Sequence, residues 1–159
     1  MPIDGRDAQI LAILQQDGRV PNTELADRVA LSASPCLRRV KALEDAGVID
    51  GYAARLDRRS LGLGLTVFME IKVDKHNFEN AKGLQEALVS MPECVACHMV
   101  SGMSDFLAEI VVPGIEDYER LVTERVLTLP MVKDVKSNFA MRTLKTNGAL
   151  PLGYLSSPA

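Results

Sequence analysis

The hydrophobic residues in the first third of the chain recur at helical spacing. Asp4 can cap a first helix that runs to about Asp17. Its inward face is predicted to carry Ile10, Ile13 and Leu14. A short second helix is predicted over residues 22–30, and with a third helix these segments can enclose a small core.

The third helix is predicted to be amphipathic and basic. Ser32 or Ser34 can cap its start, Pro35 is tolerated in its first turn, and Gly47 suits the left-handed position after its last turn. At about 100° per residue, one side carries Ala33, Cys36, Leu37, Val40 and Leu43. Ser34, Arg38 and Lys41 share the opposite side, with Arg39 beside them. We expect the apolar side to pack on the first two helices and the basic side to face outward.

Only Leu31 and Ser32 separate the second helix from the third. Two short helices, a tight turn and a cationic second helix are typical of a helix-turn-helix, whose second helix enters the major groove of DNA. The residues expected to contact DNA are Ser32, Ser34, Pro35, Arg38, Arg39 and Lys41. The alternative is an amphipathic helical hairpin whose outward charges are merely solvated. Residues 48–56 are expected to form short extended strands, a wing or an exit arm.

The periodicity changes from helical to alternating after residue 64. The Arg- and Gly-containing segment 58–64 is expected to link a first domain, residues 1–57, to a second, residues 65–145. Strands are predicted over residues 65–73, 95–99, 106–112 and 135–143, and helices over 78–91 and 118–129. This order predicts an α+β protein whose second domain is a ferredoxin-like βαββαβ unit with both helices on one face of the sheet. Residues 146–159 are expected to be a flexible or docked tail.

The uncovered face of this sheet is expected to be apolar. The residues assigned to it are Phe68, Ala96, Val100, Leu107, Val111, Ala140 and Leu144. A patch of this kind predicts that two copies of the chain associate through their sheets as a homodimer.

The composition of the chain suits one ordinary domain or two small ones. Of its 159 residues 47% are hydrophobic and only 4% aromatic, without tryptophan, so the cores must be mainly aliphatic. The first residues lack the apolar core of a signal peptide, and no run approaches the ~20 apolar residues of a membrane span. We therefore expect a cytoplasmic protein with no membrane partner and with three free cysteines.

The net charge of −3 gives no overall basic signature, but the charge is unevenly distributed. Residues 28–60 contain seven Lys and Arg against four Asp and Glu, whereas residues 61–159 contain nine against twelve. This distribution favours a DNA-contacting first domain joined to an acidic second domain.

The sequence Cys94-Val-Ala-Cys97-His98 matches the CxxCH pattern of covalent haem attachment. Residues three apart on a strand point to opposite faces, so the two thiols are not expected to reach one haem ring. His76 and His98 form no recognised zinc-ligand pair with the cysteines. No catalytic triad, P-loop or dinucleotide motif is present, so we expect no cofactor, metal or enzymatic activity.

The loop after the second strand of the sheet, Ser101-Gly-Met-Ser-Asp105, is the other candidate site. Gly102 permits a positive φ and close approach of backbone, and Asp105 places a carboxylate at the edge of an apolar sheet. The structural alternative is a hairpin turn with an Asx-type hydrogen bond.

A longer match connects both candidate sites. The segments that carry it are Glu24-Leu25-Ala26, Leu31-Ser32, Ser34-Pro35-Cys36, Arg39-Val40, Leu43-Glu44, Gly47-Val48-Ile49 and Gly51-Tyr52. They resemble the winged helix-turn-helix of the Lrp/AsnC (feast/famine) transcriptional regulators. Gly102 and Asp105, with the later pattern Tyr118, Leu129-Pro130 and Val132, resemble the effector domain of that family.

The resemblance, from about Asp4 to Lys145, implies a sequence-specific regulator that dimerises through its sheets and commonly assembles to octamers. It implies an amino-acid pocket between neighbouring dimers. By position, Gly102 and Asp105 belong to that effector site, with Met99, Val100, Phe139 and Ala140 as its lining. Met103 and Ser104 complete the loop and depart from the charged or aromatic residues of many members, which leaves the effector's identity open.

Two hypotheses of function follow. In the first, the protein binds double-stranded DNA and senses an apolar amino acid such as leucine or methionine, because Met99, Val100, Met103 and Phe139 offer an apolar, adaptable wall. In the second, it is a ferredoxin-like ligand-binding or catalytic protein whose N-terminal helices bind a protein partner. Arg38, Arg39 and Lys41 discriminate between them, since only the first predicts a salt-dependent affinity for duplex DNA.

Overall fold

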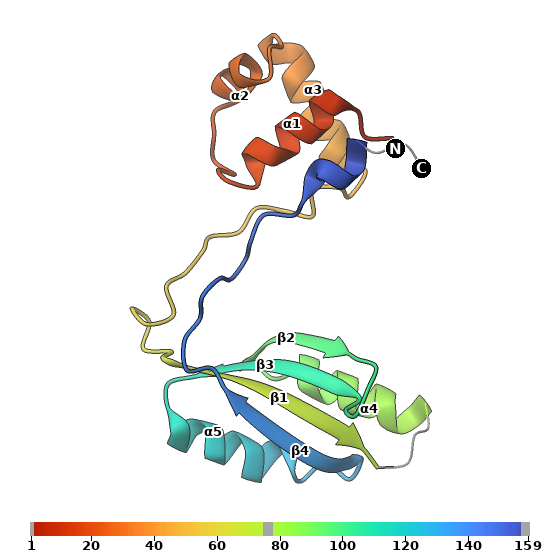
Figure 1. The fold of residues 1–159 in the computed structure, drawn as a ribbon, viewed down its shortest axis with the longest axis vertical. Helices are drawn as coiled ribbons and strands as arrows, with labels where there is room; N and C mark the ends of the chain where they lie inside the picture. Colours follow the sequence, from red (N-terminus) through yellow and green to blue (C-terminus); the bar gives the residue numbers. More distant parts are fainter. Residues whose placement is uncertain (1, 75–77, 157–159) are drawn as a thin grey trace. The chain divides into compact units, whose positions relative to one another are not determined.

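The computed structural model describes residues 2–74 and 78–156, and the chain forms two compact units (Figure 1). The first unit combines Met1–Arg55 with Lys145–Ala159, and the second is Leu56–Leu144. The chain therefore leaves the first unit, completes the second and then returns to the first.

The first unit contains three helices, α1 (Gly5–Leu14), α2 (Asn22–Arg28) and α3 (Ala33–Asp45). The prediction that Asp4 caps α1 is confirmed. Its carboxylate accepts hydrogen bonds from the backbone N–H of Arg6 and of Asp7, both at 2.8 Å, and the Asp7 carboxylate accepts the N–H of Asp4 at 3.1 Å. This reciprocal capping box satisfies donors that have no partner within the helix. The helix ends at Leu14, three residues before the predicted Asp17.

Two left-handed residues shape the ends of α2 and α3. Ala30, with φ of +52°, turns the chain between the two helices. Gly47, with φ of +68°, follows α3 as predicted, and the N–H groups of Gly47 and Val48 donate to the carbonyls of Glu44 and Leu43. This is a Schellman C-cap, which requires a left-handed residue where Gly47 lies. Ser32 occupies the N-cap position of α3 without a side-chain capping hydrogen bond.

The core of the first unit is small and aliphatic. Its buried hydrophobic residues are Ile10, Leu11, Leu25, Ala26, Val29, Cys36 and Leu43. The prediction that Leu37 packs into this core was wrong, because 57% of its surface is exposed. The buried side of α3 follows Cys36, Val40 and Leu43, and Leu37 lies beside that narrow stripe.

The C-terminal tail docks on the first unit, which decides between the two expectations for it. Gln15 and Leu150 exchange two hydrogen bonds, from side-chain amide to carbonyl and from backbone N–H to side-chain oxygen. Leu152, in the 3₁₀ helix η2 (Leu152–Ser156), packs against the helical core. Residues 48–56 form no strand and are an exit arm rather than a wing. A groove of about 370 Å³ lies between tail and arm, lined in part by Leu14, Ile49, Tyr52, Leu150 and Leu155.

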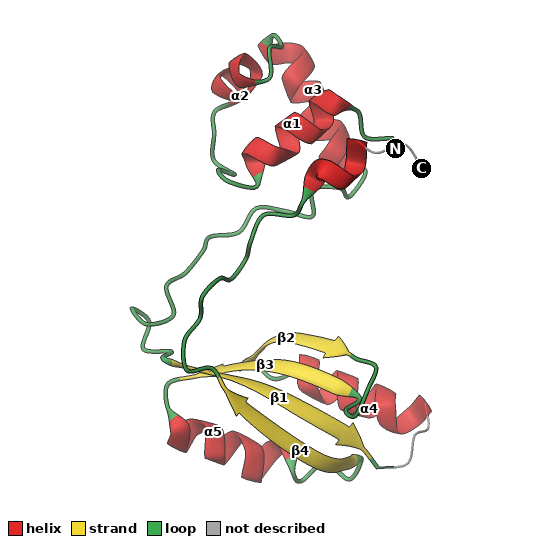
Figure 2. Ribbon diagram, viewed as in Figure 1, coloured by secondary structure: helices red, strands yellow, loops and turns green. Residues whose placement is uncertain are grey.

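The second unit has the predicted order of elements (Figure 2). These are β1 (Leu65–Val73), α4 (Phe78–Val89), β2 (Cys94–Met99), β3 (Phe106–Val112), α5 (Ile115–Leu121) with the π-helical turn η1 (Val122–Val126), and β4 (Val132–Phe139). The strands pair antiparallel in the order β2-β3-β1-β4. The structure is thus the predicted ferredoxin-like α+β fold.

One face of this sheet and both helices enclose the core of the second unit. Alternate residues of β1 and β3 are buried in it, as predicted: Val67, Met69, Ile71 and Val73, and Phe106, Ala108, Ile110 and Val112. Leu84 and Leu88 of α4 and Tyr118 and Leu121 of α5 pack on the same face. Since aliphatic residues dominate, the core matches the expectation drawn from composition.

Strand β2 departs from the expected alternation at its two cysteines. Cys94 lies opposite Ile110 and Cys97 opposite Ala108, with a register shift between Cys94 and Ala96. Directly opposite residues share a face, so both thiols lie on the helix-covered face. The prediction of opposite faces was wrong because a β-bulge adds one residue between them. Burial raises the pKa of Cys94 to about 11, so this thiol is protonated at neutral pH.

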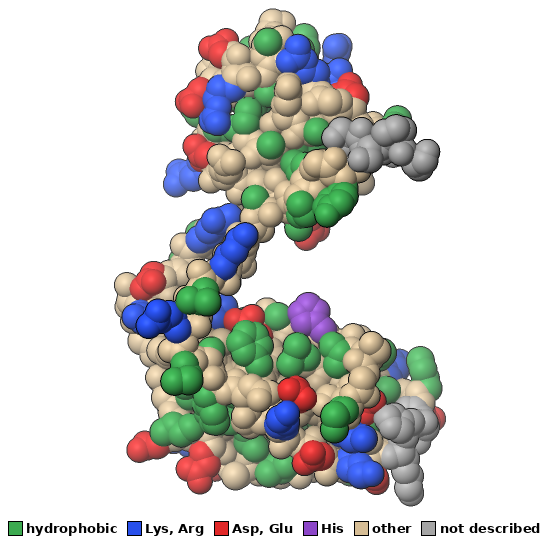
Figure 3. Space-filling view, viewed as in Figure 1, with side chains coloured by type: hydrophobic (Ala, Val, Ile, Leu, Met, Phe, Trp, Pro, Cys, Tyr) green, Lys and Arg blue, Asp and Glu red, His purple; other side chains and the backbone are tan. Residues whose placement is uncertain are grey.

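The uncovered face is more polar than expected. Leu107 lies opposite both Glu70 and His98, and Phe68 lies opposite both Glu109 and Asn138. Hydrophobic and charged side chains alternate over the second unit in Figure 3. Four of the seven predicted residues do not add an exposed apolar side chain to the strands of this face: Val111 is only 5% exposed, Val100 lies beyond β2, and Ala140 and Leu144 lie beyond β4.

Candidate functional site: the recognition helix and the Asp105 cavity

Helix α3 presents one continuous outward face. Ser34, Leu37, Arg38 and Lys41 are exposed and occupy positions i, i+3, i+4 and i+7. Ser32 before the helix is exposed, and Pro35 in its first turn is half-buried. Five of the six residues predicted to contact DNA therefore lie at or near this face, together with Leu37, which had been assigned to the core.

Arg39, the sixth, is held by acidic residues of its own unit. Its guanidinium donates to the carboxylates of Asp4 and Asp7, each at 2.8 Å. A backbone hydrogen bond from Asp7 and the hydrogen bond from Arg39 lower the pKa of Asp4, so this carboxylate stays ionised well into acid. Arg39 thus joins α3 to the start of α1, and most of its charge is balanced before any DNA arrives.

Polar contacts also fix α2 against its neighbours. The side-chain amide of Asn22 donates to the carbonyl of Ala33 at 2.9 Å, and Arg6 donates to the carbonyl of Val29 at 2.6 Å. Val29 is the C-cap of α2, where carbonyls lack helical partners, and Ala33 is the first residue of α3. These contacts hold the start of α3 in a defined orientation, which a helix that reads base edges requires.

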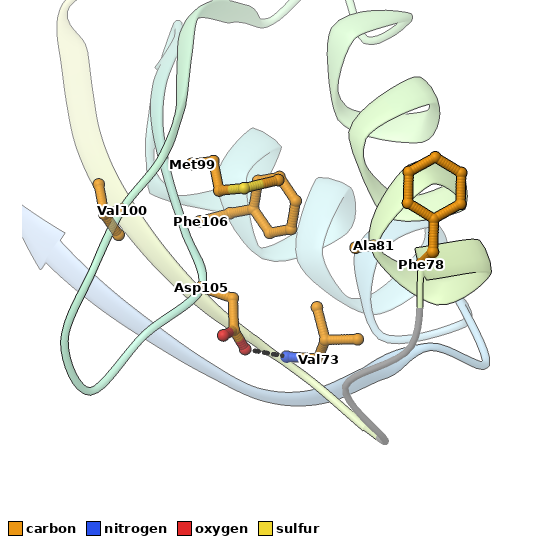
Figure 4. A pocket seen from close by; sticks show the side chains of 7 residues that line it. All are labelled: Val73, Phe78, Ala81, Met99, Val100, Asp105 and Phe106. Carbon is orange, nitrogen blue, oxygen red and sulfur yellow. Dashed lines mark hydrogen bonds between the residues drawn. The ribbon is translucent and has the colours of Figure 1, made fainter.

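The second site is a cavity of about 290 Å³ at the end of the sheet where β1 leads towards α4 (Figure 4). It is lined by Val73, Phe78, Ala81, Met99, Val100, Asp105 and Phe106. Asp105 is its acidic residue, and its carboxylate accepts the backbone N–H of Val73 at 2.8 Å. The cavity therefore combines one carboxylate with an apolar wall, and it unites three of the predicted effector residues, Met99, Val100 and Asp105.

The loop residues of the prediction lie outside the cavity lining. Gly102 has a φ of +129°, which side chains rarely tolerate, in agreement with the role predicted for a glycine. Met103 is 90% exposed, and the Ser104 hydroxyl donates to Glu70 at 3.0 Å. The Asp105 carboxylate accepts the Val73 N–H on β1, and the Asp105 carbonyl accepts the Val100 N–H across the hairpin turn at 3.0 Å, so the hairpin of the structural alternative is present.

Phe139 and Ala140 were placed in the effector site by resemblance, but they do not line this cavity. Phe139 lies opposite Val67, near the start of β1, whereas the cavity is at Val73 near its end. Its ring packs edge-on against Tyr118, with centroids 5.5 Å apart. Within one chain, these residues line a different part of the sheet.

Sequence reasoning missed Val73, Phe78, Ala81 and Phe106 as cavity residues. The alternating and helical patterns did identify all four, but only as members of core-facing stripes. Their convergence beside Asp105 depends on the pairing of β1 with β3, which periodicity alone does not give.

Among residues 2–74 and 78–156, no three His, Cys, Asp or Glu side chains are grouped so that they could hold a metal ion. His76 lies outside the described residues. None of the helices described is long and apolar enough to cross a membrane.

Known proteins share both units. Residues 66–150 match the family model of the Lrp/AsnC ligand binding domain, and residues 3–50 match that of a winged helix-turn-helix DNA-binding domain. The leucine-responsive regulatory protein of Escherichia coli is 38% identical over 148 residues, which cover 93% of this chain and 90% of that protein. The HTH-type transcriptional regulator Zrp of Zymomonas mobilis is 35% identical over 153 residues, covering 96% and 99%.

Solved structures agree with these sequence matches. A transcriptional regulator of Neisseria meningitidis, solved as an L-Met complex, has a TM-score of 0.92 at 36% identity and covers 96% of this chain and 98% of its own. An AsnC family transcriptional regulator from Agrobacterium tumefaciens has a TM-score of 0.90 at 36% identity, covering 95% and 98%. The chain therefore belongs to the Lrp/AsnC family and is a DNA-binding transcriptional regulator with a ligand-binding domain.

Proposed function

We propose that this regulator binds an apolar amino acid, leucine or methionine, at the Asp105 cavity and that binding changes its oligomeric state and its affinity for DNA. The observation that carries the proposal is the pairing of one carboxylate with an otherwise apolar lining. The similar Neisseria meningitidis regulator is an L-Met complex, which supports an effector of this size and chemistry.

The cavity offers the groups that a free amino acid needs. The ammonium group of the ligand needs an anionic partner, and the Asp105 carboxylate is one. This carboxylate has enough lone pairs to accept hydrogen bonds from both the Val73 N–H and the ligand ammonium group. The ligand carboxylate would bind backbone N–H groups of the loop around Gly102, which connects the cavity residues Val100 and Asp105. The ligand side chain would contact Met99 and Phe106, which favours apolar over charged amino acids.

Titration calorimetry with each amino acid tests this assignment. Asp105→Asn keeps a side-chain oxygen for the Val73 N–H but removes the charge, so it should fold and lose the binding of leucine and methionine. Asp134→Asn, an exposed carboxylate on β4, is the matched control and should bind as wild type does. Tight binding of a charged amino acid, or unchanged binding by Asp105→Asn, would overturn the assignment.

We also propose that different residues on the outward face of α3 contact the bases and the phosphates of DNA. Arg38, in the N-terminal half of the helix, is positioned to meet base edges, and Lys41, one turn later, to meet phosphate. Arg38→Ala should cost ~1–3 kcal/mol at one base position, whereas Lys41→Ala should weaken all sequences and reduce the salt slope by about one unit. Equal losses on specific and random duplexes for both variants would refute this division.

The dimer is proposed to form through the uncovered sheet face, and dimers to assemble further, to octamers in the commonest arrangement of the family. An effector that binds between dimers would shift this assembly and, by linkage, the affinity for DNA. Light scattering with and without leucine or methionine tests the shift. If the amino acid binds but the distribution of oligomers does not change, the proposal that effector binding controls assembly is wrong.

A further inference from the structure

Leu37 lies at the edge of the outward face of α3, between the buried stripe of the helix and its exposed polar residues. It is 57% exposed, and Ser34 and Lys41 adjoin it on one side of the helix surface, Ala33 and Val40 on the other. A single exposed leucine is ordinary on most protein surfaces. Here the leucine is exposed on the same helix as Arg38 and Lys41, which are proposed above to contact DNA.

Packing within the chain does not account for this leucine. The described residues that pack against the core of the first unit include Val40 and Leu31 but not Leu37. The tail docks against α1 and the exit arm, on residues such as Leu14 and Ile49, and so leaves Leu37 exposed. Among the described residues of the first unit, the core therefore leaves more than half of the Leu37 side chain without a packing partner.

The major groove contains one apolar group among its base edges, the C5-methyl group of thymine. A leucine side chain has no hydrogen-bond donor or acceptor, so it can discriminate between bases only through such a group. We infer that Leu37 selects thymine in the binding site by packing its side chain on this methyl group. The inference rests on α3 entering the major groove as proposed above.

The expected operator therefore contains a thymine in each half-site, next to the base contacted by Arg38. One step along α3 advances by only ~1.5 Å, so neighbouring side chains contact the same or adjacent base pairs. The alternative is that a second copy of the chain covers Leu37. In that case DNA affinity should not depend on the methyl group of thymine.

Deoxyuridine tests the inference because it removes only the methyl group of thymine. The probe is a duplex selected from a random pool by the wild-type protein, compared with the same duplex containing deoxyuridine. Wild type should lose affinity about fourfold for each methyl group withdrawn, and more when both half-sites are changed. Leu37→Ala should bind the thymine duplex more weakly than wild type and should bind both duplexes equally.

Leu127→Ala is the matched control, because Leu127 is similarly exposed (55%) but belongs to the second unit. It should keep the wild-type ratio of affinities. If Leu37→Ala fails to fold, Leu37→Gln replaces it: this variant keeps the length of the side chain at an exposed position, makes its end polar, and should lose the wild-type ratio. Equal binding of both duplexes by wild type, or loss of assembly without loss of the ratio in Leu37→Ala, overturns the inference. If the Leu37 inference fails in this way but Arg38→Ala and Lys41→Ala still lose affinity for DNA, the proposal that α3 binds DNA stands.

Discussion

Ala30 holds a backbone conformation that alanine rarely adopts. Its φ of +52° lies in the left-handed region, where a Cβ group costs roughly 1–2 kcal/mol. The turn between α2 and α3 requires this conformation, because only a sharp reversal brings the start of α3 to the Asn22 side chain. The helix-turn-helix thus contains a local strain that one substitution can relieve.

Ala30→Gly should stabilise the first unit by about 0.5–1 kcal/mol, since relief of strain exceeds the extra entropy that glycine loses on folding. Thermal melting followed by circular dichroism would show a higher Tm. Ala12→Gly, at an exposed position inside α1, is the control and should lower the Tm. A lower Tm for both variants would mean that the turn is not strained.

Asp4 gives the first unit a defined dependence on pH. Its pKa is lowered by the Asp7 backbone hydrogen bond and then by Arg39, so its contribution to stability is present above the usual pKa of 3.8 and is lost as pH falls through the lower folded value. Asp4→Asn keeps a capping oxygen but removes the charge.

The Tm difference between wild type and Asp4→Asn should therefore be largest near pH 7 and shrink below about pH 4. Melting curves at several pH values provide the measurement. Asp27→Asn, at an exposed position of α2, should show no comparable convergence in acid. A constant difference from pH 7 to pH 3 would show that the charge of Asp4 contributes nothing.

At the scale of residues, sequence reasoning succeeded where a local rule decides the outcome. The Asp4 cap and the left-handed Gly47 follow from chemistry within four residues of each position. It failed for Leu37 and for Cys97. A helical wheel places Leu37 on the edge of the apolar side, and a bulge in β2 cannot be recognised from alternation.

At the scale of elements, the order of the strands and helices in the second unit was predicted, and so were both ends of β1 and β3, but not those of β4. β4 was expected over residues 135–143 and is found over Val132–Phe139. The reason is its antiparallel partner: Phe139 pairs with Val67 and the Ala140 N–H donates to the Thr66 carbonyl, so β4 ends where β1 begins. Alternation in a sequence carries no information about the length of a neighbouring strand.

The tail is the element whose role could not be predicted. Its leucines suggested docking, but the sequence did not show that the partner is the first unit. Leu152→Ala should destabilise that unit by about 1–2 kcal/mol, less than the 2–5 kcal/mol for a fully buried leucine, because Leu152 is half-buried. Leu144→Ala, at an exposed position before the tail, is the control. Unchanged melting of both variants would show that docking of the tail is not stabilising.

At the scale of the whole molecule, assembly depends on the uncovered face of the sheet. The sequence assigned Val111 to the dimer interface, but this residue is already buried within one chain. Nearby, the Arg58 side chain donates to Thr66 and Glu109. Leu107 is the better probe, because it is only half-buried and lies opposite Glu70.

Leu107→Lys should leave the single chain folded, since the new ammonium can pair with Glu70 across the strands. In a dimer through this face the same charge would be buried, so light scattering should show dissociation and DNA binding should fall with it. Ile115→Lys, at an exposed position of α5, should remain associated. A Leu107→Lys protein that stays oligomeric would place the interface elsewhere.

Because the tail returns to the first unit, the two units are connected twice, and this affects what proteolysis can release. A protease that cuts once after Arg59 severs the only forward connection, yet the tail remains bound to α1 and the exit arm through Leu150 and Leu152. The two fragments should then elute together under native conditions and separate only in denaturant. Release of the DNA-binding unit requires a second cut, between the end of β4 and Leu150, so a single nick in the linker does not free an independent helix-turn-helix.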